Sequence, residues 1–546
     1  MSSENLHWWR GAVIYQIYPR SFRDTNGDGV GDIKGITEKL PYIADLGVDA
    51  VWISPVMKSP MKDFGYDVSD YQDIDPLFGT LDDFKAMLDK AHSLNLKIII
   101  DMIYSHTSDQ HVWFQESRKS RDNAKADWYV WADPKEDGTP PNNWVSVFGG
   151  SSWQYDSWRG QYYLHNFLKE QPDLNFHNAD VQDAVLAATR FWLDLGVDGF
   201  RLDAINFAVH DKKLRDNPKR PVVPGTFSTQ LDFVDPYSMQ WHKYDKSQPE
   251  MLEFLKRVRR LLEEYPGTMA LGEIGDDDQV ARAIEYSAPG MLHTCYNFSL
   301  VGMKARDANA FRDAIEAFES HATQAWPAWA FSNHDVTRVI SRWAGDFSTD
   351  SRIAKLLPAL LASQRGSSFL YQGEELGLPD TVVAYDDIQD PWGIYLYPKW
   401  QGRDGCRTPM PWNADSRHLG FSDGDAKPWL PVNETYGALA PDRQAVDPDS
   451  TLSFVKAFLG WRKGQAAITG GSITFEDSGS DTVLIFRRGE KGAGVYCAFN
   501  LGDKPAEVSL PGDVGIESLF TWKAQSGEVS ARALTLPPFG FFYGGF

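Results

Sequence analysis

Short runs of consecutive apolar residues alternate with stretches of helical periodicity through most of the chain. Eight of these runs have the length and the β-branched or aromatic content of buried strands: residues 13–18, 50–54, 97–103, 198–203, 268–273, 292–298, 328–333 and 368–371. Helical patterns separate several of them, over 37–45, 81–94 and 184–195. Strands that are apolar on both faces and separated by helices indicate a parallel sheet, and eight predict an α/β fold with a closed (β/α)8 (TIM) barrel.

Two segments depart from this alternation. The stretch after the third predicted strand is dense in Trp, Asp, Gly, Pro and Asn and is too long for an ordinary connection, so we interpret it as an inserted subdomain. Near the C-terminus, runs such as 482–487 and 494–499 alternate without helical periodicity, which predicts an all-β domain with a β-sandwich fold. The expected organisation is barrel at 1–104 and 179–464, inserted subdomain at 105–178 and C-terminal domain at 465–546.

The net charge and the cysteine content limit which classes of partner and which cellular compartment are expected. The 54 basic and 75 acidic residues leave a net charge of −21, which argues against nucleic acid or an anionic membrane as a partner. No stretch reaches a membrane-spanning length, and the N-terminus has no signal-peptide core. The cysteines Cys295, Cys406 and Cys497 are odd in number and form no CxxC motif, so neither a disulfide framework nor a zinc site is indicated. We expect a cytoplasmic monomer or homodimer.

The loop after the first predicted strand carries oxygen-bearing side chains at alternate positions. This spacing, with Gly29 allowing the sharp turn, is typical of the first ligands of a calcium loop. The final bidentate Glu of such a loop is missing because Gly35 stands there, and a polar turn without metal is the alternative. The predicted ligands of a structural Ca²⁺ ion, for which Mg²⁺ is a second choice, are Asp24, Asn26, Asp28, Val30 and Asp32.

Charged residues gather at the C-terminal ends of the predicted strands. Arg201 and Asp203 are two residues apart, so they lie on one side of their strand, at the end where such barrels place their chemistry. An Arg beside a carboxylate keeps it ionised and aims it, as a nucleophile requires, although a structural ion pair has the same spacing. Glu273 ends a later predicted strand, and Asp335 lies at the end of another. Two carboxyl groups, one neutral and one ionised, are what glycoside cleavage requires.

Several segments, taken together and in order, resemble a known enzyme family. Residues 101–106 (DMIYSH), 199–203 (GFRLD), 271–273 (LGE) and 332–335 (SNHD) resemble the four signature segments of the α-amylase family of glycoside hydrolases. Residues 171–175 (QPDLN) and 402–412 (GRDGCRTPMPW) resemble its α-glucosidase and oligo-1,6-glucosidase branch. The resemblance covers nearly the whole chain. One departure is Ser105, which stands where many members have Asn.

The resemblance implies a role for each matching residue. Asp203 would be the nucleophile that forms a covalent glucosyl-enzyme, Glu273 the acid and then the base, and Asp335 the residue that grips the sugar hydroxyls. Asp63 and Arg403 would clamp the far hydroxyls of the terminal glucose, which closes the pocket and favours exo-action. The implied substrate-binding residues are Asp63, Tyr66, His106, Phe167, Gln171, Arg201, Ala204, His334, Arg403 and Arg407.

Ala204 bears on the substrate. In this branch a small residue after the nucleophile goes with α-1,4 linkages and Val goes with α-1,6 linkages, so the resemblance implies maltose-like α-glucosides or sucrose as small-molecule substrates. A retaining exo-acting α-glucosidase is expected, with transglucosylation as a second outcome. A sugar isomerase is an alternative, although the Arg-Leu-Asp-Arg loop of sucrose isomerases is missing after Asp335. A transporter-subunit-like module without activity is disfavoured because all three acids are present.

Overall fold

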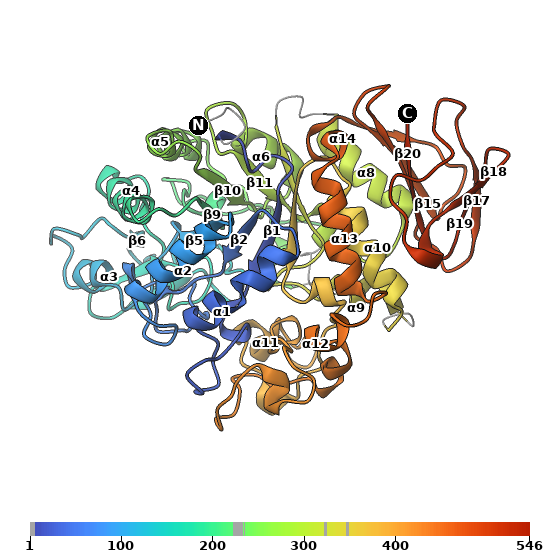
Figure 1. The fold of residues 1–546 in the computed structure, drawn as a ribbon. Helices are drawn as coiled ribbons and strands as arrows, with labels where there is room; N and C mark the ends of the chain where they lie inside the picture. Colours follow the sequence, from blue (N-terminus) through green and yellow to red (C-terminus); the bar gives the residue numbers. More distant parts are fainter. Residues whose placement is uncertain (1–5, 222–232, 234, 321–324, 346–348) are drawn as a thin grey trace.

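In the computed structural model, which describes residues 6–221, 233, 235–320, 325–345 and 349–546, a closed barrel of parallel strands forms the centre of the protein (Figure 1). Around the barrel the strand order is β1-β13-β12-β11-β10-β9-β5-β2. Their bounds are β1 Val13–Ile17, β2 Ala50–Ile53, β5 Lys97–Ile103, β9 Gly199–Asp203, β10 Met269–Glu273, β11 Thr294–Asn297, β12 Pro327–Ala330 and β13 Ser367–Tyr371. The predicted TIM barrel is confirmed.

Helices cover the outside of the barrel, each with an apolar face turned toward the strands. In α5, for example, the buried Met251, Leu255, Val258 and Leu262 recur at helical spacing. A capping box formed by Thr80 and the third helical residue begins α2. The barrel helices are α1 Ile33–Asp45, α2 Leu81–Ser93, α4 Ala179–Asp194, α5 Met251–Glu263, α6 Gln279–Tyr286, α8 Ala308–Glu319, α10 Ser351–Ala362 and α13 Thr451–Lys463.

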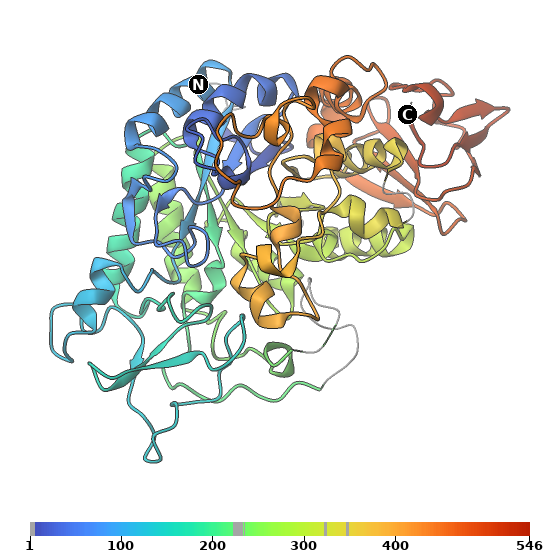
Figure 2. The same ribbon diagram turned by 90° about the horizontal axis from the view of Figure 1, so that it is seen from below.

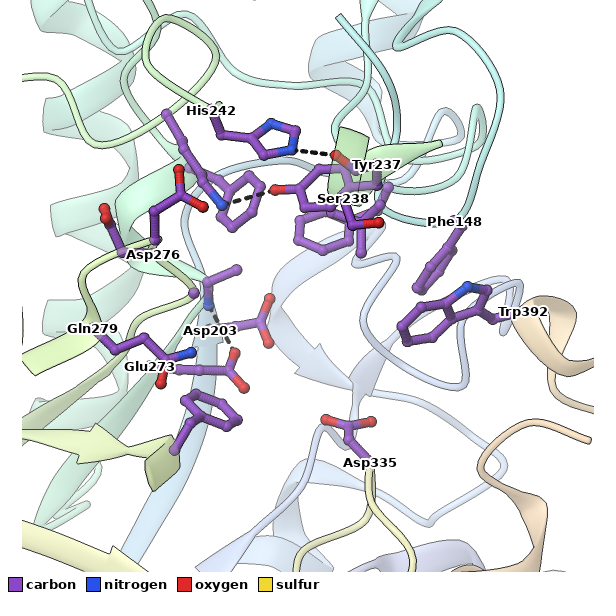
Figure 3. A pocket seen from close by; sticks show the side chains of 18 of the residues that line it. Phe148, Asp203, Tyr237, Ser238, His242, Glu273, Asp276, Gln279, Asp335 and Trp392 are labelled. Atoms are coloured by element: carbon purple, nitrogen blue, oxygen red, sulfur yellow. Dashed lines mark hydrogen bonds between the residues drawn. The ribbon is translucent and has the colours of Figure 1, made fainter. Parts of the chain in front are cut away.

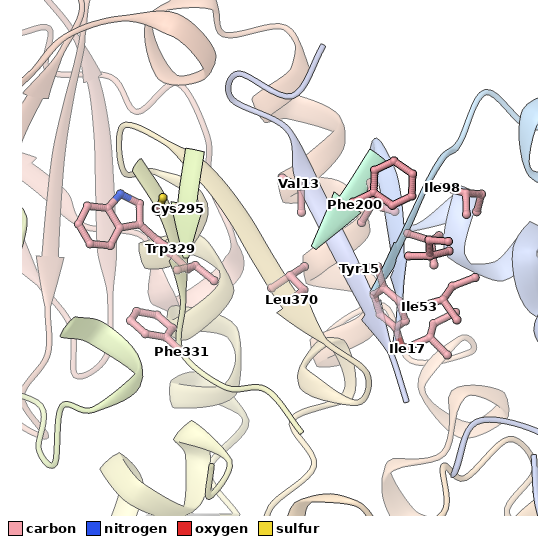
Figure 4. Packing of buried hydrophobic residues seen from close by; sticks show 14 of the residues in the cluster. Val13, Tyr15, Ile17, Ile53, Ile98, Phe200, Cys295, Trp329, Phe331 and Leu370 are labelled. Carbon is pink, nitrogen blue, oxygen red and sulfur yellow. The ribbon is translucent and has the colours of Figure 1, made fainter. Parts of the chain in front are cut away.

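The side-chain alternation of each barrel strand divides the core into two layers. Residues such as Ile98 and Phe200 point outward and pack against the helices, as the close-up of this layer shows (Figure 4). Inside the barrel, Trp52, Ile99 and Leu271 form a separate apolar cluster. Arg201 pairs in register with Leu271, so it belongs to the inner side, and its guanidinium carbon lies 5.2 Å from the ring centroid of Trp52.

An inserted three-stranded sheet and a two-stranded antiparallel pair extend the barrel. Between β5 and α4, a sheet of order β6-β8-β7 is formed by β6 Trp131–Ala132, β7 Trp153–Asp156 and β8 Gln161–Leu164, preceded by α3 Val112–Ser117. After β2, β3 Met57–Lys58 pairs with β4 Asp70–Ile74. Figure 2 shows the inserted sheet beside the long segment after β9, far from the C-terminal strands. The other short helices are α7 Phe298–Val301, α9 Val339–Ala344, α11 Pro391–Leu396, α12 Pro441–Gln444 and α14 Ala466–Gly470.

The C-terminal region consists of two antiparallel sheets that share one apolar cluster. Side chains such as Ile485 and Ala498 of the larger sheet meet Val508 and Leu534 of the smaller one, which is sandwich packing. The larger sheet contains β14 Ile473–Glu476, β15 Val483–Arg488, β16 Val495–Asn500 and β20 Phe541–Gly545; the smaller contains β17 Ala506–Ser509, β18 Glu528–Ser530 and β19 Ala533–Leu536. Within the described residues, no helix is long and apolar enough to cross a membrane.

Candidate active site

A cavity of about 580 Å³ opens at the C-terminal ends of the barrel strands. Asp203 is the last residue of β9 and Glu273 the last residue of β10, whereas Asp335 lies in the loop after β12, which ends at Ala330 instead of continuing to residue 333. All three carboxylates line the cavity and point into the same open space from different sides (Figure 3). The fold thus brings together three acids that are far apart in the sequence.

The guanidinium of Arg201 forms ion pairs with two of these acids, Asp203 and Glu273. Arg201 is 2% exposed; its Nη1 lies 2.6 Å from Asp203 Oδ1, and its Nη2 lies 2.6 Å from Glu273 Oε1. Its Nη1 also contacts Oδ1 of Asp101 at 2.7 Å, a residue of β5 that also accepts a hydrogen bond from Trp52. Sharing one guanidinium keeps the two carboxyl groups close, which favours the separation of about 5–5.5 Å found in retaining glycosidases.

Burial shifts the proton affinities of this acid pair. It raises the pKa of Asp203 to about 7, against the opposing charge of Arg201 and with a further increase from the charge of Asp101. It also raises the pKa of Glu273 to about 7, and the charge of Asp203 adds to that increase. An ionised Asp203 therefore favours a protonated Glu273, so near neutral pH the pair can supply one nucleophile and one acid. The expectation that Arg201 keeps Asp203 ionised did not include burial, which raises this pKa.

Arg403 lines the side of the cavity away from Asp203 and Glu273. We call this side the arginine end and define it by Asp63, Asp335 and Arg403. Arg403 lies 3.2 Å from Asp63 Oδ1 and 3.1 Å from Asp335 Oδ1. Arg407 adds a contact of 2.8 Å to the same oxygen of Asp335. Burial alone would raise the pKa of Asp335, but His334, Arg403 and Arg407 outweigh it and hold that pKa well below its usual range. Asp335 is therefore ionised whenever the enzyme is folded near neutral pH.

Asp390 stands behind the arginine end and was not among the predicted site residues. It is fully buried and accepts hydrogen bonds from the backbone N–H, Nε and Nη2 of Arg403, at 2.7, 3.0 and 2.7 Å. These bonds fix the direction of the Arg403 side chain. Asp101 was not predicted as a site residue either. It is the first residue of the 101–106 signature segment, and this position could have identified it.

Aromatic and imidazole rings form the wall between these charged groups. Tyr66 stacks on His334 with centroids 5.4 Å apart, and its hydroxyl lies 2.6 Å from His334 Nε2. The other ring nitrogen of His334 pairs with Gln16 at 2.8 Å, so His334 supports Tyr66 from behind and does not itself line the cavity. Arg407 and Arg201 also lie behind the lining residues. Asp63, Tyr66, His106, Phe167, Gln171, Ala204 and Arg403 do line it.

Gln171 connects the inserted subdomain to the arginine end. Its Nε2 donates to Asp63 Oδ2 at 3.1 Å and lies 3.0 Å from His106 Nε2. Burial lowers the pKa of His106 to about 4, so its ring is neutral at neutral pH. The ring of Phe167 lies 5.3 Å from that of His106. Gln171, predicted from the 171–175 segment, and Phe167 therefore meet the barrel residues at one wall.

Ala204 has a left-handed backbone with φ of 38°, uncommon for a residue with a side chain. This conformation turns its N–H toward Glu273, whose Oε2 accepts a hydrogen bond of 3.0 Å. The residue after the predicted nucleophile thus positions the predicted acid.

The remaining side of the cavity, which we call the lysine end, is defined by Phe207, Tyr237 and Lys246. Tyr237 stacks on His242 with ring centroids 3.7 Å apart, and both lie across the open space from Asp335 (Figure 3). Lys246 Nζ donates to the Tyr237 hydroxyl at 2.8 Å. None of these residues was predicted, because the segment that carries most of them has no regular hydrophobic pattern.

The loop with the predicted calcium ligands packs beside residues 421–429, through Asp24 N to Phe421 O at 2.8 Å and Trp429 N to Gly29 O at 2.9 Å. Its carboxylates accept hydrogen bonds from the chain itself: Asp24 from three backbone N–H groups of the loop, and Asp32 from Thr25 and from Gly35 at the start of α1. In the described part of the chain, no three His, Cys, Asp or Glu side chains lie where they could hold a metal ion. The donors are chemically suited to Ca²⁺, but their carboxylates do not converge.

Comparisons with known proteins agree with this architecture. The model of the alpha amylase catalytic domain family matches residues 16–471. A probable alpha-glucosidase of Rhizobium meliloti is 53% identical, covering 92% of this chain and 91% of the relative, and an oligo-1,6-glucosidase of Heyndrickxia coagulans is 37% identical, covering 93% and 94%.

Solved structures show the same fold. The alpha-glucosyl transfer enzyme XgtA has a TM-score of 0.94 at 53% identity, covering 98% of this chain and 99% of that one. The trehalulose synthase MutB of Pseudomonas mesoacidophila has a TM-score of 0.88 at 31% identity, covering 98% and 99%. The chain belongs to the alpha-amylase family of glycoside hydrolases.

Proposed function

We propose that this protein is a retaining, exo-acting α-glucosidase that releases the terminal glucosyl residue of short α-glucosides. The observation that carries the proposal is the shared contact of Asp203 and Glu273 with Arg201, in a cavity whose far side is closed by Arg403 and its acids. Relatives at 53% and 37% identity are named probable alpha-glucosidase and oligo-1,6-glucosidase, in line with this activity.

The proposed reaction has two displacements. Asp203 attacks the anomeric carbon while Glu273 gives its proton to the glycosidic oxygen, so one C–O bond forms as the other breaks and the leaving group departs as an alcohol. Glu273 then takes a proton from water, whose oxygen attacks the same carbon and releases Asp203. No hydrogen bond among the described residues goes to Asp203 Oδ2, so this oxygen is open to the cavity.

Exo-action follows from the closed arginine end. Asp63, Asp335 and Arg403 are each less than one-fifth exposed and joined by ion pairs, so a longer sugar chain has no path beyond the terminal glucose. We propose that Asp63, Asp335 and Arg403 bind the hydroxyls of that glucose. The small side chain of Ala204 beside Glu273 supports maltose-like or sucrose-like substrates over isomaltose.

Glucosyl transfer is the second candidate. It is supported by the resemblance to XgtA, described as an alpha-glucosyl transfer enzyme, and by aromatic side chains such as Phe207 and Tyr237 that can receive an acceptor other than water. Sugar isomerisation, the alternative expected from the sequence, is disfavoured because the Arg-Leu-Asp-Arg loop is missing after Asp335.

We also propose that the 24–32 loop binds a structural Ca²⁺ ion, with Mg²⁺ as the alternative, supported by its oxygen-only donors and the φ of +92° at Gly29. No catalytic step passes through this ion. We propose a cytoplasmic location, supported by three buried free cysteines, and a monomeric or homodimeric state.

The test is turnover of maltose, sucrose and isomaltose by the wild type, Asp203→Asn and a control, Asp89→Asn, whose side chain is exposed on α2. The wild type should cleave maltose or sucrose faster than isomaltose. Asp203→Asn should lose at least about 10⁴-fold in kcat with an unchanged circular dichroism spectrum, and Asp89→Asn should match the wild type. Faster cleavage of isomaltose than of both other sugars contradicts the linkage preference, and a nearly active Asp203→Asn contradicts the mechanism.

A further inference from the structure

Lys246 is a buried cation whose partners are incomplete. Lys246 is only 5% exposed. Within the described chain, its Nζ makes one hydrogen bond, to the neutral Tyr237 hydroxyl at 2.8 Å. No carboxylate of the described residues lies within ion-pair distance of Nζ. Its ammonium has three donors, so two N–H groups have no acceptor among the described residues. A buried ammonium with a single neutral partner is costly, unless a ligand supplies the missing acceptors.

The amine is held in place by a rigid frame. Nζ lies 4.7 Å from the ring centroid of Phe207 and 5.2 Å from that of Tyr237, so two aromatic faces flank it. Tyr237 is in turn fixed by His242, which stacks on it, pairs with Asp245 Oδ2 at 2.5 Å and donates from Nε2 to the Tyr237 carbonyl at 2.8 Å. Such a frame fixes where the remaining N–H groups point.

Two charged pairs on this side show the contrast with Lys246. Arg220 lies 2.9 Å from Asp277, and Asp276 accepts hydrogen bonds from Ser247 and Arg282. Lys246 lines the same cavity as Asp203 and Glu273. The space that its free N–H groups can reach is therefore the cavity itself.

The position relative to Glu273 indicates which part of a substrate the amine meets. Glu273 is the proposed acid, so the leaving group lies on its side of the cavity, away from the arginine end. Figure 3 shows Tyr237, the hydrogen-bond partner of Lys246, above Asp203 and Glu273 and opposite Asp335. A leaving group attached to the glycosidic oxygen extends toward this frame.

We propose that Lys246 determines leaving-group specificity, by donating a hydrogen bond from Nζ to a hydroxyl oxygen of the leaving sugar or of an incoming sugar acceptor. This inference rests on the proposed α-glucosidase function and adds the chemical class of the leaving group. Polyhydroxylated leaving groups are favoured over apolar ones because only they supply the missing acceptor.

The test compares maltose with phenyl α-glucoside, whose leaving group has no acceptor beyond the glycosidic oxygen. Lys246→Met leaves an unbranched side chain one atom shorter and removes the donors. It should lower kcat/KM for maltose by about 10- to 100-fold, mainly through KM, with a loss on phenyl α-glucoside at least about tenfold smaller. Lys246→Arg, which keeps a cation, should recover part of the preference for maltose. Lys243→Met, at an exposed lysine three residues earlier, is the matched control and should leave both substrates unaffected.

Equal losses on the two substrates, or no loss on maltose, would overturn the role of Lys246. If Lys246→Met does not fold, Tyr237→Phe, which removes the partner that aims the amine, should lower the ratio of maltose to phenyl α-glucoside turnover by about threefold; an unchanged ratio overturns the proposal. Turnover by the wild type is measured in the same assay. A wild type that cleaves neither glucoside would overturn the α-glucosidase proposal itself.

Discussion

At the arginine end of the cavity each charged side chain forms an ion pair with an opposite charge. At the lysine end, the buried ammonium of Lys246 forms no ion pair within the described residues and has only a neutral hydrogen-bond acceptor. Arg403 contacts Asp63, Asp335 and Asp390, and Arg407 adds a second contact to Asp335. Among the described residues, Lys246 Nζ has a single acceptor, the neutral Tyr237 hydroxyl. A network completed within the protein is preorganised for one fixed ligand, and the proposed ligand there is the terminal glucose. Donors left open suit a ligand part that varies between substrates.

Of the changes that test this difference between the two ends, Asp390→Asn should have the largest effect on activity. The substitution removes the charge that holds Arg403 through three hydrogen bonds, so the guanidinium loses its fixed direction toward Asp63 and Asp335. We expect kcat/KM to fall by about 10- to 100-fold on maltose and on phenyl α-glucoside alike, because the arginine end binds the glucosyl unit that both share. Asp386→Asn, an exposed acid four residues earlier, is the control. A loss that depends on the leaving group would erase the distinction between the two ends.

The pH dependence should be common to both substrates. Burial raises the pKa of Asp203 and of Glu273 to about 7. Activity should therefore fall as pH drops, because Asp203 gains a proton and cannot attack, and fall as pH rises, because Glu273 loses the proton that it must donate. The kcat/KM profile should be bell-shaped with its maximum near pH 7, with about a tenfold loss per pH unit outside that range. A profile that is flat from acidic to alkaline pH, or that shifts with the leaving group, contradicts this assignment.

The smallest effect should come from the 24–32 loop, which lies outside both ends. If it binds Ca²⁺, excess calcium after EDTA treatment should raise the melting temperature by about 1–3 °C without changing the ratio of maltose to phenyl α-glucoside turnover. Asp28→Ala should abolish the rise, and a parallel titration with Mg²⁺ identifies the preferred ion. An equal rise in the Asp28→Ala protein would place the ion elsewhere.

The barrel and the arginine end were predictable, for different reasons. Strands buried on both faces leave uninterrupted apolar runs, so their existence was clear, while their ends were less so: the strand predicted to reach residue 333 stops at Ala330. Asp335 and Arg403 lie within recognisable motifs. Asp390 and Lys246 do not, because each matters only through a neighbour that folding brings close.

The electrostatics were the least predictable part. Arg201 next to Asp203 indicated an ionised carboxylate, but the sequence could not show that the same guanidinium also contacts Asp101 and Glu273. Burial, with a further contribution from the charge of Asp101, raises the pKa of Asp203 despite the ion pair with Arg201. Likewise, Asp32 in the predicted calcium loop serves as the N-cap of α1, a use that its spacing did not reveal.

The most direct test of the central claim is the anomeric configuration of the glucose first released from phenyl α-glucoside, followed by NMR before mutarotation. If Asp203 attacks the sugar and water then replaces it, with Glu273 acting on both steps, the first product is α-glucose. Initial release of β-glucose would mean a single displacement by water, and it would contradict the role of Asp203 as nucleophile.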